Sequence, residues 1–178
     1  MIITVAGLAG TGTSSLAKNL SQTLDYPFIS SGNIFRQTAV SLGLSLYQLD
    51  DLAQNNPKYD LALDEEIRLY ARDHSDCVID SRLAWYFIPR SLKIKLFADY
   101  HTRISRVASR EEISFDQASQ KTKIREEAIK DRYIRYYNLP DFNADQHFDL
   151  VIDTSKRDVT EVARIVFHYL DQKKEFEE

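Results

Sequence analysis

The sequence contains a single cysteine, Cys77, and no apolar run approaching the length of a membrane span. One cysteine excludes an intrachain disulfide, and no Cys/His metal cluster can be assembled around it. A membrane-spanning helix needs about 20 consecutive apolar residues, so we expect no membrane partner. The apolar start Met1–Ala9 has no basic segment before it, which indicates a buried strand and not a signal peptide. We therefore expect a cytoplasmic location.

The sequence also lacks an excess of basic residues. It has 23 Lys and Arg residues and 27 Asp and Glu residues, which gives a formal net charge of -4. Nothing in this balance points to a polyanionic partner, and we expect no nucleic-acid binding. The 178 residues are 43% hydrophobic and 28% charged, which is typical of a globular chain with a sizeable core. Internal repeats and low-complexity linkers are absent, which predicts one domain over residues 1–178, as a monomer or small homo-oligomer.

Short apolar segments separated by longer helical patterns make up most of the chain. Four segments predict strands: Ile2–Ala6, Cys77–Asp80, Leu92–Phe97 and Leu150–Ile152. Tyr26–Ile29 predicts a weaker fifth strand. Three of the four lack polar alternation, as is typical of parallel strands covered on both faces. The alternation of strands with helices predicts an α/β fold with a mainly parallel sheet.

A glycine-rich loop joins the first predicted strand to the first predicted helix, with the sequence Gly7-Leu8-Ala9-Gly10-Thr11-Gly12-Thr13-Ser14-Ser15. Glycines let the backbone bend so that consecutive N–H groups point at one place, next to the positive end of the helix dipole. In this context the loop predicts a site for a nucleoside triphosphate. Ser14 occupies the position from which such a loop supplies a ligand to Mg²⁺. The alternative is a glycine turn that binds no nucleotide.

The general phosphate-loop motif, G-x-x-x-x-G-K-[ST], has a lysine where this chain has Thr13. The positive charge near the β- and γ-phosphates must then come from another residue. Lys18 lies about one helical turn further on, and we expect it to point away. An arginine from a lid is the favoured source.

The predicted strand Cys77–Asp80 ends in an aspartate, and an arginine follows two residues later. Asp80 could hold a magnesium-bound water near Ser14, and Arg82 could clamp a phosphate through two parallel hydrogen bonds. The alternative is an ion pair at the strand end with no chemical role. Function is favoured, because ligands of open α/β sheets bind at the carboxyl ends of the strands.

Two segments, residues 31–73 and 99–138, carry helix signals with no strand between them, and we expect helical inserts on the sheet core. The second is rich in arginine at helical spacing, and the residues that share faces are Arg103, Arg106 and Arg110, and then Arg125 and Arg132. Such stripes could be solvated surface. They could instead close over transferring phosphates and exclude water.

The first of these segments contains candidates for binding an acceptor. Arg36 could hold an acceptor phosphate or be an exposed helix residue. Asp60 and Asp64 share a helix face and could read the amino group of a base. The solvated alternative is favoured for both carboxylates, because most surface charges are only solvated.

Taken together, these motifs resemble the archaeal-type cytidylate kinases, a branch of the P-loop nucleoside monophosphate kinases. The resemblance covers nearly the whole chain, at Gly7–Ser14, Ser31–Arg36, Asp80–Trp85, Arg125–Tyr133 and Asp149–Ser155. Members of the family commonly have G-T-G-T-[ST] in the loop, so Thr13 fits the family. The chain departs where the family usually has Glu-Gly-Arg, at Asp80-Ser81-Arg82, and where it has Asp-Arg-Arg, at Asp64-Glu65-Glu66.

The resemblance implies transfer of a phosphoryl group from ATP to CMP or dCMP with Mg²⁺, giving the diphosphate and ADP. It also implies a three-layer P-loop NTPase fold with a five-stranded parallel sheet. The core would comprise residues 1–30, 75–102 and 148–178, with an acceptor-binding insert at about 31–74 and a lid at about 110–140. Asp153-Thr154-Ser155 would lie near the donor base.

The same resemblance assigns roles to individual side chains. It implies catalytic roles for Asp80, Arg82, Arg125 and Arg132, substrate binding by Ser31, Gly32, Arg36, Asp64 and Arg82, and metal binding by Ser14 and Asp80. Two alternatives remain open. One is a P-loop kinase for another small-molecule acceptor, and the other is a non-catalytic nucleotide-binding regulatory module.

Overall fold

The structure is a computed structural model that describes residues 1–177, with side chains described through Lys173. The elements in chain order are β1 (Ile2–Gly7), α1 (Thr13–Leu24), β2 (Phe28–Ser30), α2 (Ser31–Ser41), α3 (Leu46–Asn55), α4 (Lys58–Asp73), β3 (Cys77–Asp80), α5 (Ala84–Phe87), β4 (Leu92–Phe97), α6 (Tyr100–Glu111), α7 (Phe115–Tyr137), the 3-10 turn η1 (Asp145–His147), β5 (Leu150–Asp153) and α8 (Val159–Glu177).

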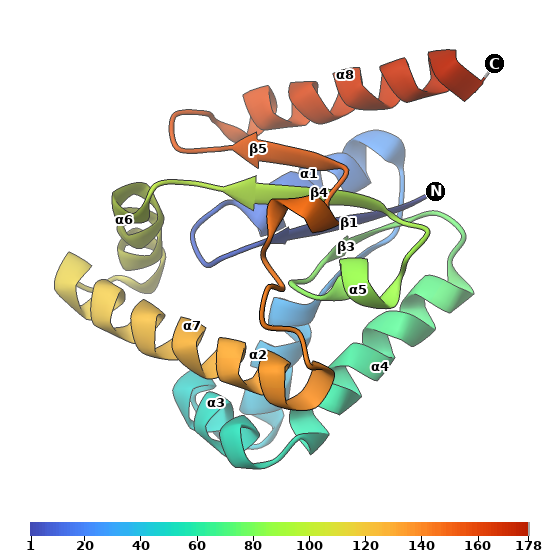
Figure 1. The fold of residues 1–178 in the computed structure, drawn as a ribbon. Coiled ribbons are helices and arrows are strands. Elements are labelled where there is room, and N and C mark those ends of the chain that lie inside the picture. The colour runs from blue at the N-terminus through green and yellow to red at the C-terminus, as the bar shows by residue number, and fades with distance from the viewer. Residues whose placement is uncertain (178) are drawn as a thin grey trace.

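The five strands form one parallel sheet in the order β2-β3-β1-β4-β5 (Figure 1). All five predicted strands are confirmed, including the weak one, whose strand starts at Phe28. The central strand β1 pairs with β3 on one side and β4 on the other. The loop that follows β1 therefore emerges from the middle of the sheet, with the ends of β3 and β4 beside it.

Helices cover both faces of the sheet, which makes the three layers of the α/β fold. On one face, Ile3 and Val5 of β1 pack with residues of α1 and α8. On the other face, Ala6 packs with Trp85 of α5 and with Phe142, which lies beyond the end of α7. Burial of both faces extends to β4, the strand in which Lys93 and Lys95 alternate with apolar residues, because Lys95 is itself buried.

Two helical groups project from the carboxyl ends of the strands. Helices α2, α3 and α4 follow β2, and α6 and α7 follow β4. Both α3 and α7 begin at a capping box, in which Ser45 pairs with Gln48 and Ser114 pairs with Gln117. In Figure 1, α7 runs beside α3, and backbone contacts between the two helices confirm that they are neighbours.

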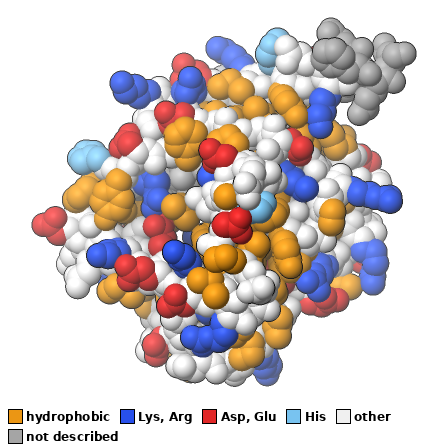
Figure 2. Space-filling model, in the orientation of Figure 1, with side chains coloured by type: hydrophobic (Ala, Val, Ile, Leu, Met, Phe, Trp, Pro, Cys, Tyr) orange, Lys and Arg blue, Asp and Glu red, His pale blue; other side chains and the backbone are white. Residues whose placement is uncertain are grey.

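In the part of the chain that the structure describes, no helix is both long and apolar enough to span a bilayer. On the face drawn in Figure 2, Lys and Arg side chains are interspersed with Asp and Glu side chains and form no large patch of one sign.

Candidate active site

A cavity of about 1030 Å³ opens at the carboxyl ends of β1 and β3. It runs from the glycine-rich loop to the starts of α2 and α3 on one side, and to α6 and the start of α8 on the other. Seven of its lining side chains are cationic and three are acidic, although the whole chain carries a net negative charge. The cationic ones are Lys18, Arg36, Arg82, Arg106, Arg110, Arg125 and Arg157. The cavity is thus built for an anionic ligand.

Every predicted residue of the glycine-rich loop lines this cavity, namely Gly7, Gly10, Thr11, Gly12, Thr13, Ser14 and Ser15. The outer side of the loop is held by two arginines of α6. Arg103 Nε donates to the carbonyl of Ala9 at 3.1 Å, and Arg106 Nη1 donates to the carbonyl of Gly10 at 3.2 Å. Arg103 is 6% exposed, so the alternative of a solvated arginine stripe is wrong for this residue.

These contacts set the direction of the loop's peptide groups. The carbonyl of Thr11 also accepts a hydrogen bond, from Thr154 Oγ1 at 2.9 Å. In a trans peptide the C=O and the following N–H point in opposite directions. Fixing the carbonyls of Ala9 and Thr11 therefore turns the N–H groups of Gly10 and Gly12 to the other side of the loop. Helix α1 starts directly after Gly12, so its unpaired first N–H groups add to an anion site.

Ser14 and Asp80 meet at the floor of the cavity, as the end of β3 lies beside the start of α1. Ser14 Oγ donates to Asp80 Oδ2 at 2.5 Å, and Ser30 Oγ donates to the same oxygen at 3.0 Å. Mg²⁺ takes oxygen ligands, and enzymes commonly hold it with one or two carboxylates plus substrate phosphates. The oxygens of Ser14 and Asp80 fit that ion. Among the side chains that the structure describes, no group of three or more His, Cys, Asp or Glu forms a complete protein cage for a metal.

On the acceptor side, the structure brings Ser31, Gly32, Arg36, Arg82 and Arg125 to the same cavity. Arg82 Nε is buried and has no hydrogen-bond partner in the described part of the chain. Burial and the nearby positive charge of Arg82 lower the pKa of the Arg125 guanidinium. Two guanidinium groups held near each other in a partly buried space repel, and an anion between them would relieve that repulsion.

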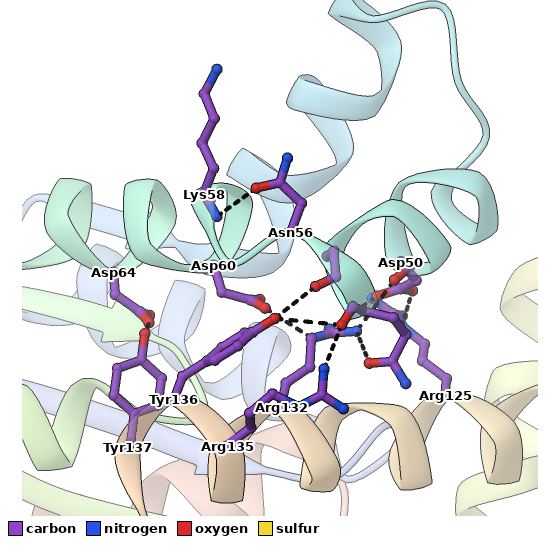
Figure 3. Close-up of polar contacts among 12 residues, drawn as sticks. Asp50, Asn56, Lys58, Asp60, Asp64, Arg125, Arg132, Arg135, Tyr136 and Tyr137 are labelled. Atoms are coloured by element: carbon purple, nitrogen blue, oxygen red, sulfur yellow. Dashed lines mark hydrogen bonds and ion pairs between the residues drawn. The ribbon is translucent and has the colours of Figure 1, made fainter.

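The structure does not bring Arg132 to this cavity. Its side chain is 3% exposed, with Nε 2.9 Å from Asp60 Oδ2 and Nη2 3.3 Å from Asp50 Oδ1 (Figure 3). Arg132 lies on the side of α7 that packs against α3 and α4, so its charge is already paired inside the protein. This corrects the expectation that Arg132 contacts the transferring phosphates as Arg125 could. The sequence spacing placed both arginines on one helix face but did not indicate what covers each of them.

Asp64 does not line the cavity either. Its carboxylate accepts a hydrogen bond from the Tyr137 hydroxyl of α7 (Figure 3). Asp60 and Asp64 are 7% and 9% exposed, so the favoured interpretation of two solvated carboxylates is wrong. Burial raises the pKa of both, and that of Asp64 reaches about 6 although the Tyr137 hydrogen bond opposes the rise.

Asp64→Asn is expected to stabilise the protein above pH 7. Ionisation of Asp64 opposes folding, because its pKa rises from the usual 3.8 to about 6 in the folded state. Wild-type Asp64 therefore carries no cost below about pH 4, and the cost grows between about pH 4 and 6 and is complete above that. Asparagine keeps an oxygen for Tyr137 without the charge. Urea unfolding should give the variant ~2–3 kcal/mol more stability at pH 8 and little at pH 4. Equal differences at both pH values would contradict a buried, titrating carboxylate.

Two cavity residues that the sequence did not indicate are Tyr47 and Glu111. The Tyr47 hydroxyl donates to Glu111 Oε2 at 3.0 Å and so links the start of α3 to the end of α6. Burial and the Glu111 carboxylate raise the pKa of Tyr47 to about 12. The capping box Ser45-Leu46-Tyr47-Gln48 was the available signal, because it fixes where α3 begins. Lys18, which we expected to point away, also lines the cavity.

Comparisons with known proteins agree with this geometry. The model of the cytidylate kinase-like family matches residues 2–156. A cytidylate kinase from Methanobrevibacter smithii is 38% identical over 166 residues, which cover 93% of this chain and 96% of the relative. A cytidylate kinase from Methanothrix thermoacetophila is 40% identical over 158 residues, or 89% of this chain and 91% of the relative.

Solved structures support the fold. An uncharacterized protein from Eubacterium ventriosum superposes with a TM-score of 0.70 at 21% identity, over 96% of this chain and 98% of that one. A shikimate kinase from Bacteroides thetaiotaomicron has a TM-score of 0.64 at 13% identity, over 96% and 98% of the two chains. The sheet order, the glycine-rich loop and the family match agree, and the chain belongs to the cytidylate kinase-like family of P-loop nucleoside monophosphate kinases.

Proposed function

We propose that the protein transfers the γ-phosphoryl group of ATP to CMP or dCMP with Mg²⁺, giving ADP and the nucleoside diphosphate. The observation that carries this proposal is the shared cavity, in which the phosphate loop and a second set of cationic residues face one space. That second set includes Arg36 and Arg82. The cavity has a volume of about 1030 Å³, at the upper end of the ~300–1,000 Å³ typical of ligand sites in proteins.

In this proposal the donor triphosphate lies on the N–H groups of the glycine-rich loop, with its base toward Asp153-Thr154-Ser155. Arg106 ties the two parts of this subsite together, because its Nη2 donates to the Thr154 carbonyl at 2.7 Å and its Nη1 contacts the loop. Ser14 and Asp80 hold Mg²⁺, directly or through water. When bound, the metal neutralises charge on the β- and γ-phosphate oxygens.

The acceptor phosphate lies between the start of α2 and the end of β3, where Ser31, Gly32, Arg36 and Arg82 line the cavity. One of its oxygens attacks the γ-phosphorus, and the bond to the β-phosphate oxygen breaks as the new bond forms. No general base is needed, since the acceptor is already an anion. Arg82 and Arg125 supply the positive charge that Thr13 of the loop cannot.

The departure from the family pattern at Glu65 and Glu66 affects this site little. Both side chains are exposed on α4, and neither lines the cavity. The buried neighbour Asp64 is held by Tyr137. Cytidylate as acceptor is therefore compatible with the altered sequence. We further propose that residues 31–74 act as the acceptor-binding insert and residues 110–140 as the lid, within one domain.

An ADP-release assay with Mg-ATP and a panel of CMP, dCMP, UMP, AMP and GMP tests the proposed function. CMP and dCMP are expected to give the highest kcat/KM, and chelation of Mg²⁺ with EDTA is expected to abolish turnover. If another monophosphate gives the highest kcat/KM, that nucleotide and not CMP or dCMP is the acceptor. Binding of Mg-ATP in a thermal-shift assay without turnover on any acceptor would point instead to the non-catalytic module.

A further inference from the structure

A buried ion-pair network of Asp50, Asp60, Arg125 and Arg132 joins α7 to α3 and α4 (Figure 3). Asp50 is its centre. One carboxylate oxygen lies 2.7 Å from Arg125 Nε, and the other lies 3.3 Å from Arg132 Nη2. The side chain of Asp50 is 10% exposed. Its single negative charge therefore serves two arginines that lie seven residues apart on α7.

The two arginines use this network in different ways. Arg132 places Nε on Asp60 and directs Nη1 and Nη2 to the carbonyl and carboxylate of Asp50. Its whole guanidinium is committed inside the protein. Arg125 places only Nε on Asp50, and it also lines the cavity beside Arg82. Among the described residues it has no other ion-pair partner, so its two terminal nitrogens remain available to a ligand.

This arrangement has an electrostatic reason. Arg125 shares the cavity with a like charge, the Arg82 guanidinium, and burial together with that charge lowers the pKa of Arg125. Without a counter-charge behind it, a half-buried arginine would turn away from Arg82 toward solvent. The carboxylate of Asp50 offsets that repulsion from the far side. Asp50 itself is held in place, since Arg132 contacts both its carboxylate and its backbone carbonyl.

We propose that Asp50 is a positioning residue that holds Arg125 at the phosphate subsite beside Arg82, and that Arg132 fixes Asp50 for this role. The inference rests on the proposed function, in which Arg82 and Arg125 neutralise the transferring phosphoryl group. It gives Arg132 an indirect part in the reaction in place of the direct contact that the sequence suggested. It also makes α3 part of the machinery that orients Arg125.

A double-mutant cycle tests this role. Asp50→Asn is expected to lower kcat about 10- to 100-fold, as loss of an orienting partner does elsewhere, and to raise the KM for ATP by a smaller factor. In an Arg125→Ala background the same substitution is expected to change kcat by less than about twofold, because the residue through which it acts is gone. Asp51→Asn is the matched control, since Asp51 is the exposed neighbour on the same helix. It is expected to match wild type.

Additive effects of the two substitutions would overturn the proposal, because Asp50 would then act independently of Arg125. Urea unfolding of each variant separates lost stability from lost orientation. If Asp50→Asn does not unfold cooperatively, Asp50→Glu replaces it in the cycle, since the longer side chain keeps the charge but displaces the carboxylate. The same non-additivity is expected there.

The same double-mutant cycle can be measured by ligand binding, without any catalytic turnover. Inorganic pyrophosphate, which needs no recognition of a base, is titrated by calorimetry into the four proteins of the cycle. Its affinity is expected to fall in Asp50→Asn and to fall no further when that change is added to Arg125→Ala. If the wild-type protein phosphorylates none of the monophosphates, the proposed function is rejected. The pyrophosphate measurements still decide whether Asp50 positions Arg125.

Discussion

Arg82→Ala is expected to lower kcat/KM for the acceptor by about 10³-fold or more, the range found for arginines that neutralise a transferring phosphoryl group. Arg82 lines the cavity at the end of β3, and its buried Nε has no hydrogen-bond partner among the residues that the structure describes. Its charge therefore has no structural pairing to lose, and the cost should fall on the reaction. Steady-state kinetics with CMP and Mg-ATP measure the effect.

Arg82→Lys separates charge from geometry. Lysine keeps the positive charge but cannot form two parallel hydrogen bonds to a phosphate, so intermediate activity is expected. Arg90→Ala is the matched control, because Arg90 is an exposed arginine in the same segment and lies outside the cavity. Its kinetics should equal those of wild type. Near wild-type turnover in Arg82→Ala would count strongly against the proposed role.

The fold was largely predictable because its main signals are local. Cys77–Asp80 is an uninterrupted apolar run ending in a carboxylate, which is what a buried parallel strand looks like. Even the three-residue strand β2 lies within or next to the predicted segment Tyr26–Ile29. The expectation that Ser14 and Asp80 meet also depended on local order, since Ser14 lies at the end of the loop that follows β1 and Asp80 is the last residue of β3. Residues at the carboxyl ends of adjacent parallel strands must share one edge of the sheet.

The partners of charged residues on helices were not predictable in the same way. Helical spacing shows which residues share a face, and it placed Arg125 with Arg132 correctly in that sense. It does not show that α3 and α4 cover only one end of that face. Asp60 looked like a solvated carboxylate for the same reason, because its counter-charge, Arg132, comes from a helix far along the chain. Such pairings depend on tertiary packing, which a single sequence leaves undetermined.

Gly10→Ala is expected to disrupt the phosphate loop. Gly10 has φ +82, and a Cβ at this position would lie 2.3 Å from the Arg103 carbonyl oxygen. That oxygen belongs to the backbone of α6 and cannot rotate away. We expect a stability loss of about 1–2 kcal/mol from the left-handed conformation alone. Displacement of the loop should lower kcat/KM for ATP by about 100-fold.

Two other glycines separate backbone strain from steric collision. Gly12 and Gly43 also have positive φ, at +93 and +68, but a Cβ would meet nothing within 4 Å at either position. Gly12→Ala places strain in the loop without a collision, and Gly43→Ala places it at the end of α2, outside the cavity. The KM for ATP should therefore rise most in Gly10→Ala, less in Gly12→Ala and not at all in Gly43→Ala. If Gly10→Ala bound ATP as well as Gly43→Ala does, the close packing of α6 against the loop would not be what holds the phosphate site in shape.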